Sequence, residues 1–380
     1  MLKRKSLLKN EGLQSVIASL ICVLLGLLAG YIVLLFINPE GAWKAILAII
    51  KNFFTYPSDQ ARLKYFGSTL VKTAPLLMCA LSVLFAYKVG LFNIGVAGQY
   101  TAGIGISLYA ALAWGLPWWI CVLLAMFVGA ILGAISGALK SFYNVNEVIS
   151  GIMLNWITLY LVNTLLNSPL SKEFTSPYTK VLENTAKQAL LPSLGMGTLF
   201  NNNKYVTIAI PLAVVLAVVV WVVLEKTRFG YELKATGLNK NAAKYCGMAE
   251  RRNTILTLLI SGALAALGAA MLYLSGYEQW ECGTSSVPAM GFNGIAAAFL
   301  GGLNPIGTVL SSYFIQHITI GGAYVDKSVY SSQIADLISA IIVYLCGFVF
   351  FMKVMMKKYV TRREERLAMR EAGEKGGDTT

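Results

Sequence analysis

The chain has 380 residues, of which 57% are hydrophobic and 13% are charged, and its mean hydropathy is +0.65. This balance excludes an ordinary soluble protein, and apolar runs of about 20 residues recur along the chain, as in polytopic membrane proteins. The net charge of +13 does not indicate a nucleic-acid partner, because the basic residues cluster at loop ends and at both termini.

The apolar runs are continuous rather than alternating, so they predict an all-α transmembrane bundle of about ten spans, with a range of about eight to ten. In chain order, the expected spans are Ser15–Ile37, Thr69–Tyr87, Ile94–Leu116, Trp118–Leu139, Val148–Leu166, Val206–Leu224, Asn253–Tyr273, Val287–Leu303, Ile306–Gly321 and Ile334–Met352. The eighth and ninth are short, and Gly301–Gly307 joins them. They are either two full spans or a re-entrant pair of half-helices within 287–321.

The basic residues predict the topology. An even number of spans puts the basic N-terminus (1–14), the loop 225–252 and the basic tail (353–380) on one side of the membrane domain (15–352). The loop alone holds seven basic and three acidic residues. Because cytoplasmic loops carry an excess of Lys and Arg, we expect this side, with both termini, to be cytoplasmic.

Two longer segments are expected on the outer side. In 38–68, the apolar positions of Ala42–Phe54 recur at helical spacing, which predicts a helix lying in the outer membrane interface against lipid. The segment 168–205 is polar and of mixed charge. It is long enough for a small cap over an outer opening, and it fits an ordinary surface loop equally well.

The chain has few residues that could carry out chemistry, so we expect no catalytic residue, no metal site and no cofactor. His317 is its only histidine, and packing explains it best. The H-E-x-x-H, G-x-S-x-G and P-loop motifs are absent, so the chain cannot hold ATP by itself. The six cysteines form no C-x-x-C pair and are expected to be packing residues.

An ion-coupled secondary carrier is one function open to a polytopic membrane protein, and such carriers use carboxylates inside the membrane. Glu147 and Asp336 lie near the starts of the fifth and tenth spans. The favourable placement of a carboxylate at a helix N-terminus explains both equally well. Glu147 nevertheless remains a candidate residue of the solute path.

Uncharged amides are more informative than charges in these spans. They lie beside several glycines where apolar helices should begin, and a buried amide costs a few kcal/mol unless it is paired. The residues expected to line or border a path for a hydrophilic solute are Asn93, Gln99, Asn146, Glu147 and Asn155. The alternative for each amide is a hydrogen bond between helices.

The polar stretch Gly230–Arg252 predicts a short helix in the cytoplasmic loop. Asn239 is suited to cap its N-terminus, and Gly247 to close it. Helical spacing puts Ala242, Ala243 and Cys246 on one side, where small side chains would let the helix enter a groove of a partner. A basic loop that meets lipid headgroups is the alternative.

Three segments carry a family resemblance: GLFNIGVAGQ (90–99), NEVISGIMLNWI (146–157) and ELKATGLNKNAAKYCGM (232–248). Together they resemble the permease subunits of bacterial ABC importers in the ribose and branched-chain amino acid permease superfamily. The nucleoside branch, which works with a lipoprotein of the basic-membrane-protein type, is the most similar. The likeness runs from about Thr69 to Met352.

The resemblance implies a multi-pass subunit of the bacterial plasma membrane that works in a complex. A second permease subunit, often a non-identical relative, completes the pore, two ATP-binding cassette subunits bind ATP below it, and an extracytoplasmic solute-binding lipoprotein delivers the solute. The positions that match the family's cytoplasmic coupling loop are Ala235, Gly237, Asn239, Ala242, Ala243 and Gly247. The expected solute is a nucleoside, with simple sugars or amino acids as alternatives.

Overall fold

The computed structural model describes residues 11–326 and 328–330, with scattered positions between 337 and 361. In this part of the chain the regular structure is helical, apart from two isolated β-bridges. The elements are α1 (Glu11–Ile37), α2 (Pro39–Lys51), η2 (Asn52–Thr55), α3 (Asp59–Lys88), α4 (Val96–Leu112), α5 (Trp118–Tyr143), α6 (Glu147–Leu166), α7 (Leu182–Thr185), η3 (Lys187–Ala189), α8 (Met196–Leu199), α9 (Ala209–Lys226), α10 (Arg228–Leu238), α11 (Lys240–Tyr245), α12 (Glu250–Tyr273), α13 (Ala289–Leu300), α14 (Pro305–Gly321) and η4 (Gly322–Tyr324). The all-α prediction is confirmed.

Five of the described helices, α3, α5, α6, α9 and α12, are long and apolar enough to cross a membrane. The chain is therefore a polytopic membrane protein. The predicted tenth span (334–352) falls largely outside the described residues. So do most of the basic N-terminus (1–14) and most of the basic tail (353–380).

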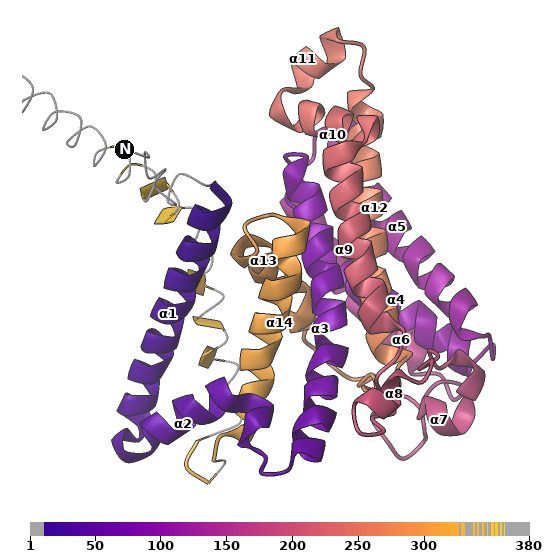
Figure 1. The fold of residues 1–380 in the computed structure, drawn as a ribbon. Helices are drawn as coiled ribbons and strands as arrows, with labels where there is room; N and C mark the ends of the chain where they lie inside the picture. The colour runs from indigo at the N-terminus through magenta and orange to yellow at the C-terminus, as the bar shows by residue number, and fades with distance from the viewer. Residues whose placement is uncertain are drawn as a thin grey trace, which may run out of the picture.

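The centre of the bundle is formed by α3, α4 and α12. The most apolar windows of α3 and α12 are 89% and 72% buried, while those of α5, α6 and α9 are about one-third buried or less. The outer helices expose Leu, Ile, Val and Phe side chains, which suits contact with lipid. Figure 1 shows α3, α9 and α12 standing side by side along the long axis of the molecule.

Glycines bring α5 and α12 into backbone contact. A Cβ atom at Gly133 would lie 2.0 Å from the carbonyl oxygen of Leu258, and one at Gly262 would lie 2.1 Å from that of Gly129. Such close approach is how membrane helices gain van der Waals contact, since lipid provides no hydrophobic drive for association. These glycines fix the position of α12, which carries part of the candidate site.

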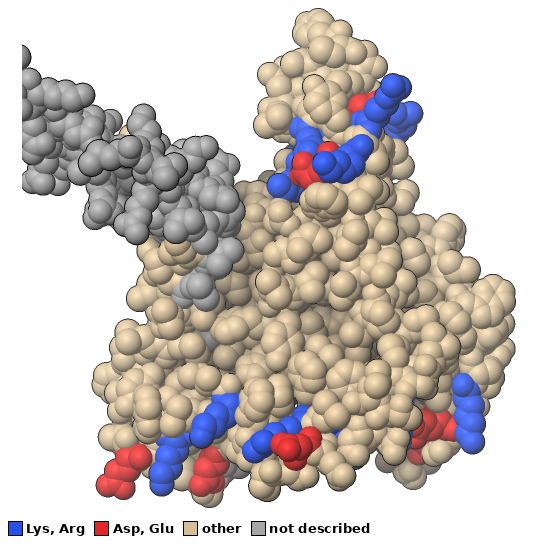
Figure 2. Space-filling view, in the orientation of Figure 1, with Lys and Arg blue, Asp and Glu red and all other residues tan. Residues whose placement is uncertain are grey.

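The two ends of the bundle differ. At one end α10 and α11 project beyond the other helices. At the opposite end α2 lies crosswise below α1 and α14, and α7 and α8 lie on the other side of the same end (Figure 1). Lys, Arg, Asp and Glu gather at these two ends, with an uncharged zone between them (Figure 2). This banding fits a molecule whose middle lies in the hydrocarbon of a membrane.

The expected helix near Ala42–Phe54 is present as α2 and η2. Asn38 caps α2 by accepting hydrogen bonds from the backbone N–H groups of Glu40 and Gly41. The segment 168–205 contains short helices, and it is tied to the segment after α12 by hydrogen bonds such as Leu191 N–H to Leu274 O (3.0 Å).

The pair α13 and α14 is joined by a tight turn at 301–304. At 12 residues, α13 is about 18 Å long, too short for a hydrocarbon core of about 30 Å. Its Gly294 packs against Cys79 in the middle part of α3, and Phe299 contacts Tyr87 near the end of α3. Of the two alternatives left open by the sequence, a half-helix describes α13 better than a full span.

Candidate functional site

The cytoplasmic loop predicted from its basic charge consists of two helices. Thr227 caps α10 by accepting a hydrogen bond from Gly230 N–H (3.1 Å), and Asn239 caps α11 by accepting one from Ala242 N–H (3.0 Å). Gly247 follows α11 with φ of +79°, a left-handed conformation that suits glycine. The predicted short helix and both of its caps are confirmed.

The faces of this loop differ from the predicted arrangement. Ala243 is buried at 4% exposure, while Ala242 and Cys246 are exposed, so the three do not share one accessible side. The large side chains that stand out are Leu238 at 88% and Tyr245 at 93% exposure. Neither residue was among those predicted from the sequence. Their signal was an apolar and an aromatic residue in an otherwise polar loop.

The loop is fixed to the bundle at two points. A Cβ atom at Gly237 would lie 2.3 Å from the carbonyl oxygen of Val89, just after α3. Asn253, near the start of α12, donates a hydrogen bond to Thr236 Oγ1 (2.9 Å), and both residues are buried. The end of α10 is therefore in direct contact with both the segment after α3 and the start of α12.

Two of the predicted path amides lie in one buried hydrogen-bond network. Asn93 Nδ2 donates to Gln99 Oε1 (2.8 Å) and to Ser261 Oγ (2.7 Å), and Ser261 donates to the carbonyl oxygen of Ser82 (2.7 Å). Asn93 and Gln99 are each 3% exposed. The network joins the α3–α4 connection to α12, across 168 residues of sequence.

Asn155 links α6 to the start of α4. Its Oδ1 accepts from Gly98 N–H (2.7 Å), and its Nδ2 donates to Ile94 O (3.0 Å). A Cβ atom at Gly98 would lie 2.6 Å from Asn155 Oδ1, so glycine is needed for this contact. The structure thus gives these amides interhelical partners. Their role beside a solute path stays a prediction.

Asn146 and Glu147 lie at the start of α6. Asn146 is exposed and caps the helix by accepting a hydrogen bond from Val148 N–H (2.8 Å). Glu147 pairs with Lys140 at the end of α5, with 2.8 Å between Nζ and Oε2 and side-chain exposures of 20% for Lys140 and 14% for Glu147. This ion pair links the end of α5 to the start of α6.

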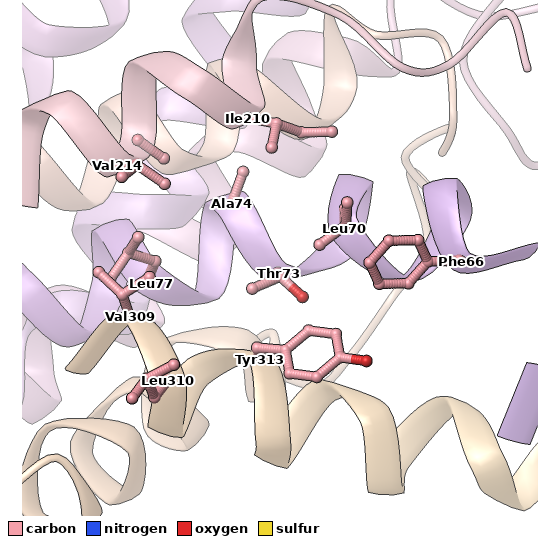
Figure 3. Close-up of a pocket in the computed structure, with 11 residues that line it drawn as sticks. Phe66, Leu70, Thr73, Ala74, Leu77, Ile210, Val214, Val309, Leu310 and Tyr313 are labelled. Carbon is pink, nitrogen blue, oxygen red and sulfur yellow. The ribbon is translucent and has the colours of Figure 1, made fainter. Parts of the chain in front are cut away.

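A cavity of about 360 Å³ lies between α3, α9 and α14 (Figure 3). Its lining is almost wholly apolar. Figure 3 shows Thr73 and Tyr313 as its labelled polar side chains, among Leu, Ile, Val, Phe and Ala. A hydrophilic solute would find too few hydrogen-bond partners there. His317, nearby on α14, has its Nε2 2.9 Å from the carbonyl oxygen of Ile50, which is a packing contact.

Residues 65–347 match the family described as the permease component of branched-chain amino acid transport systems. The chain belongs to this family. The match covers far more than half of the chain and includes the candidate path amides and the α10–α11 loop. It confirms the resemblance to ABC permease subunits, which are transport components rather than enzymes.

Similar proteins include several nucleoside permeases. The nucleoside ABC transporter permease NupB of Lactococcus lactis is 31% identical over 92% of this chain and 95% of its own. The guanosine ABC transporter permease NupP of Bacillus subtilis is 30% identical over 91% and 97%. The glucose ABC transporter permease TsgB13 of Haloferax volcanii is 28% identical over 73% and 75%. Lactococcus lactis has a second matching permease, NupC, and Bacillus subtilis has a second one, NupQ.

Proposed function

We propose that this permease subunit forms one half of the pore of a bacterial ABC importer for nucleosides. The family match supports the permease role, and the two relatives aligned over more than nine-tenths of the chain are named for nucleoside and guanosine transport. A second, non-identical permease would complete the pore, by analogy with the paired relatives. A solute-binding lipoprotein would deliver the nucleoside from outside.

The observation that carries the proposal is the exposed surface of the projecting α10–α11 loop. Leu238 and Tyr245 are exposed on the α10–α11 helix pair, whose two helices are both capped. The pair projects beyond the other helices (Figure 1). Exposed large side chains on a rigid element are typical of binding surfaces. We propose that ATP-binding cassette subunits dock here, with Ala235, Gly237, Asn239, Ala242, Ala243 and Gly247 forming the coupling loop.

The orientation follows from this docking. We propose that the α10–α11 loop and both termini are cytoplasmic and that the subunit resides in the plasma membrane. The seven basic residues of the loop support this orientation. The amides Asn93, Gln99, Asn146 and Asn155 and the carboxylate of Glu147 are proposed to border the inner part of the solute route. Asn155 and Glu147, which are paired with other protein groups, would hold the helices there rather than touch the solute.

The test is transport by the reconstituted complex. The permease pair, the ATPase subunits and the binding protein are placed in proteoliposomes, and uptake of labelled guanosine is measured with ATP inside. Uptake that needs ATP and survives collapse of ion gradients supports the proposal. Uptake that needs an ion gradient and no ATP would favour the secondary carrier. Absence of guanosine uptake together with ATP-dependent uptake of labelled glucose would favour a sugar permease.

Docking is tested separately by ATPase recovery with tagged permease. Tyr245→Ala together with Leu238→Ala should lower recovery at least about tenfold, because central apolar anchors each contribute more than about 1 kcal/mol to binding. Tyr143→Ala is the matched control, since Tyr143 is 76% exposed at the end of α5 on the same side. Equal recovery from both variants would place the docking surface elsewhere.

A further inference from the structure

The segment 284–288, between α12 and α13, runs into the membrane domain beside α6. At its start, the carbonyl oxygen of Thr284 accepts a hydrogen bond from Asn163 Nδ2 (2.8 Å), one turn before the end of α6 at Leu166. Beyond its end, Gly291 packs against Ala97, and the next residue of α4, Gly98, packs against Asn155. The segment therefore descends from the outer end of α6 to about its middle.

This descending segment is not helical, and it is accessible. Ser285 and Ser286 are exposed, and the N–H groups of Ser285 and Val287 have no hydrogen-bond partner among the described residues. Lipid cannot satisfy such groups, so non-helical backbone at membrane depth occurs only where it is buried in protein or lines water. The exposed hydroxyls of Ser285 and Ser286 favour water.

The neighbouring face of α6 carries two exposed aromatic side chains. Trp156 is 43% and Tyr160 is 58% exposed, and their rings are stacked with centroids 6.3 Å apart and an interplanar angle of 28°. Tyr160 precedes Asn163 by three residues, so both lie on the same side of α6. Asn163 bonds to Thr284, the residue before Ser285, so this side of α6 and the start of the descending segment adjoin in one surface.

This surface is neutral. No Asp, Glu, Lys or Arg occurs in 148–171 or in 282–325. A zwitterionic amino acid or a phosphorylated solute would be left without a charged partner, which is costly away from bulk water. A nucleoside needs none: its base offers a flat face for stacking on aromatic rings, and its ribose offers hydroxyls for hydrogen bonds.

We propose that Trp156, Tyr160, Ser285 and Ser286 line the outer half of the solute route and that the aromatic pair stacks on the base of the nucleoside. The assignment rests on the proposed function, because it names the surface that would hold that solute. The two serines and the free N–H groups of the descending segment bind the ribose hydroxyls. The second permease closes the route from the other side.

The first experiment tests whether the surface is wet. In the assembled transporter, with Cys246 and Cys346 replaced by Ser, Ser286→Cys is treated with a charged, membrane-impermeant thiol reagent. Val219→Cys is the control, because Val219 is 45% exposed on the apolar face of α9. We expect labelling of Ser286→Cys and none of Val219→Cys. If Ser286→Cys is labelled no more than Val219→Cys, the proposed route is wrong, whatever the solute is.

The second experiment tests base stacking by the KM for guanosine uptake. Tyr160→Leu and Trp156→Leu should each raise KM about tenfold, and Tyr160→Phe should keep the wild-type value because it keeps the ring. Leu161→Ala on the same helix is the control, since Leu161 is 64% exposed and lies beside the pair in sequence. An unchanged KM in both Leu variants would overturn the stacking role.

The two failures can be distinguished. A wild-type complex that imports no nucleoside rejects the proposed function and, with it, the base-stacking assignment, while labelling of Ser286→Cys would still support a wet route. A wild-type complex that imports guanosine, with unlabelled Ser286→Cys and unchanged KM values, keeps the proposed function and rejects the inferred surface.

Discussion

Gly237, at the end of α10, packs on Gly90, which follows the end of α3. A Cβ atom on Gly90 would lie 2.9 Å from the carbonyl oxygen of Gly237, and Gly90 has a φ of +75°. Three residues later, Asn93 enters the buried network with Gln99 and Ser261. We therefore expect that a displacement of the α10–α11 loop would be passed by this backbone contact to the connection between α3 and α4.

Gly237→Ala should disturb this contact. The added methyl group would lie 2.3 Å from Val89 O and 2.9 Å from Gly90 N, and backbone atoms cannot give way as a flexible side chain can. Overpacking of this kind costs about 1–3 kcal/mol. We expect a lower melting temperature and weaker stimulation of ATP hydrolysis by solute and binding protein.

The control for this variant is Gly283→Ala. A Cβ atom at Gly283 meets nothing within 4 Å, so its melting temperature should match the wild type. If Gly237→Ala melts like Gly283→Ala and couples normally, the close contact has no mechanical role.

Asn155→Leu should destabilise the bundle. The substitution removes the acceptor for Gly98 N–H and the donor to Ile94 O, and each buried group left unpaired costs about 1–3 kcal/mol. We expect a lower melting temperature with normal uptake per folded transporter. Thr158→Val, a nearly isosteric change one turn away on α6, serves as control. A wild-type melting temperature with a raised KM would instead favour contact between Asn155 and solute.

If the Lys140–Glu147 ion pair is structural, exchanging the two residues should preserve its function. Glu147→Gln leaves a mostly buried ammonium without its carboxylate partner, and hydrogen bonds to charged groups contribute about 1.5–3 kcal/mol. We expect this variant to be less stable and the double variant Lys140→Glu, Glu147→Lys to regain stability and uptake. A stable double variant that cannot transport would show that Glu147 acts on solute or on a coupling ion.

Cys246 reports the side of the membrane on which the α10–α11 loop lies. It is exposed, whereas the other described cysteines are buried, namely Cys22, Cys79, Cys121 and Cys282. With Cys346 replaced by Ser, an impermeant thiol reagent should label the protein in inside-out vesicles and not in intact cells. Cys246→Ser should abolish the signal. Labelling of intact cells would reverse the proposed orientation and separate the loop from any cytoplasmic ATPase.

The sequence by itself determined the class of protein and the local structure. Continuous apolar runs require helices in lipid, because an unpaired backbone group there has no water to bind. The helix around Lys240–Tyr245 was also predictable, since a cap such as Asn239 and a left-handed Gly247 depend on neighbours within a few residues. The matching segments likewise sufficed to predict the family.

Only the tertiary structure decided which side of each element faces inward. In a soluble helix, polarity separates the core face from the solvent face, but lipid is as apolar as a core, so this signal is lost. The sequence could therefore not show that, on α6, Leu159 is buried while Tyr160 is exposed. Nor could it predict that Asn93 pairs with Ser261 or that the start of α13 packs against the start of α4, because these contacts join residues far apart in the chain.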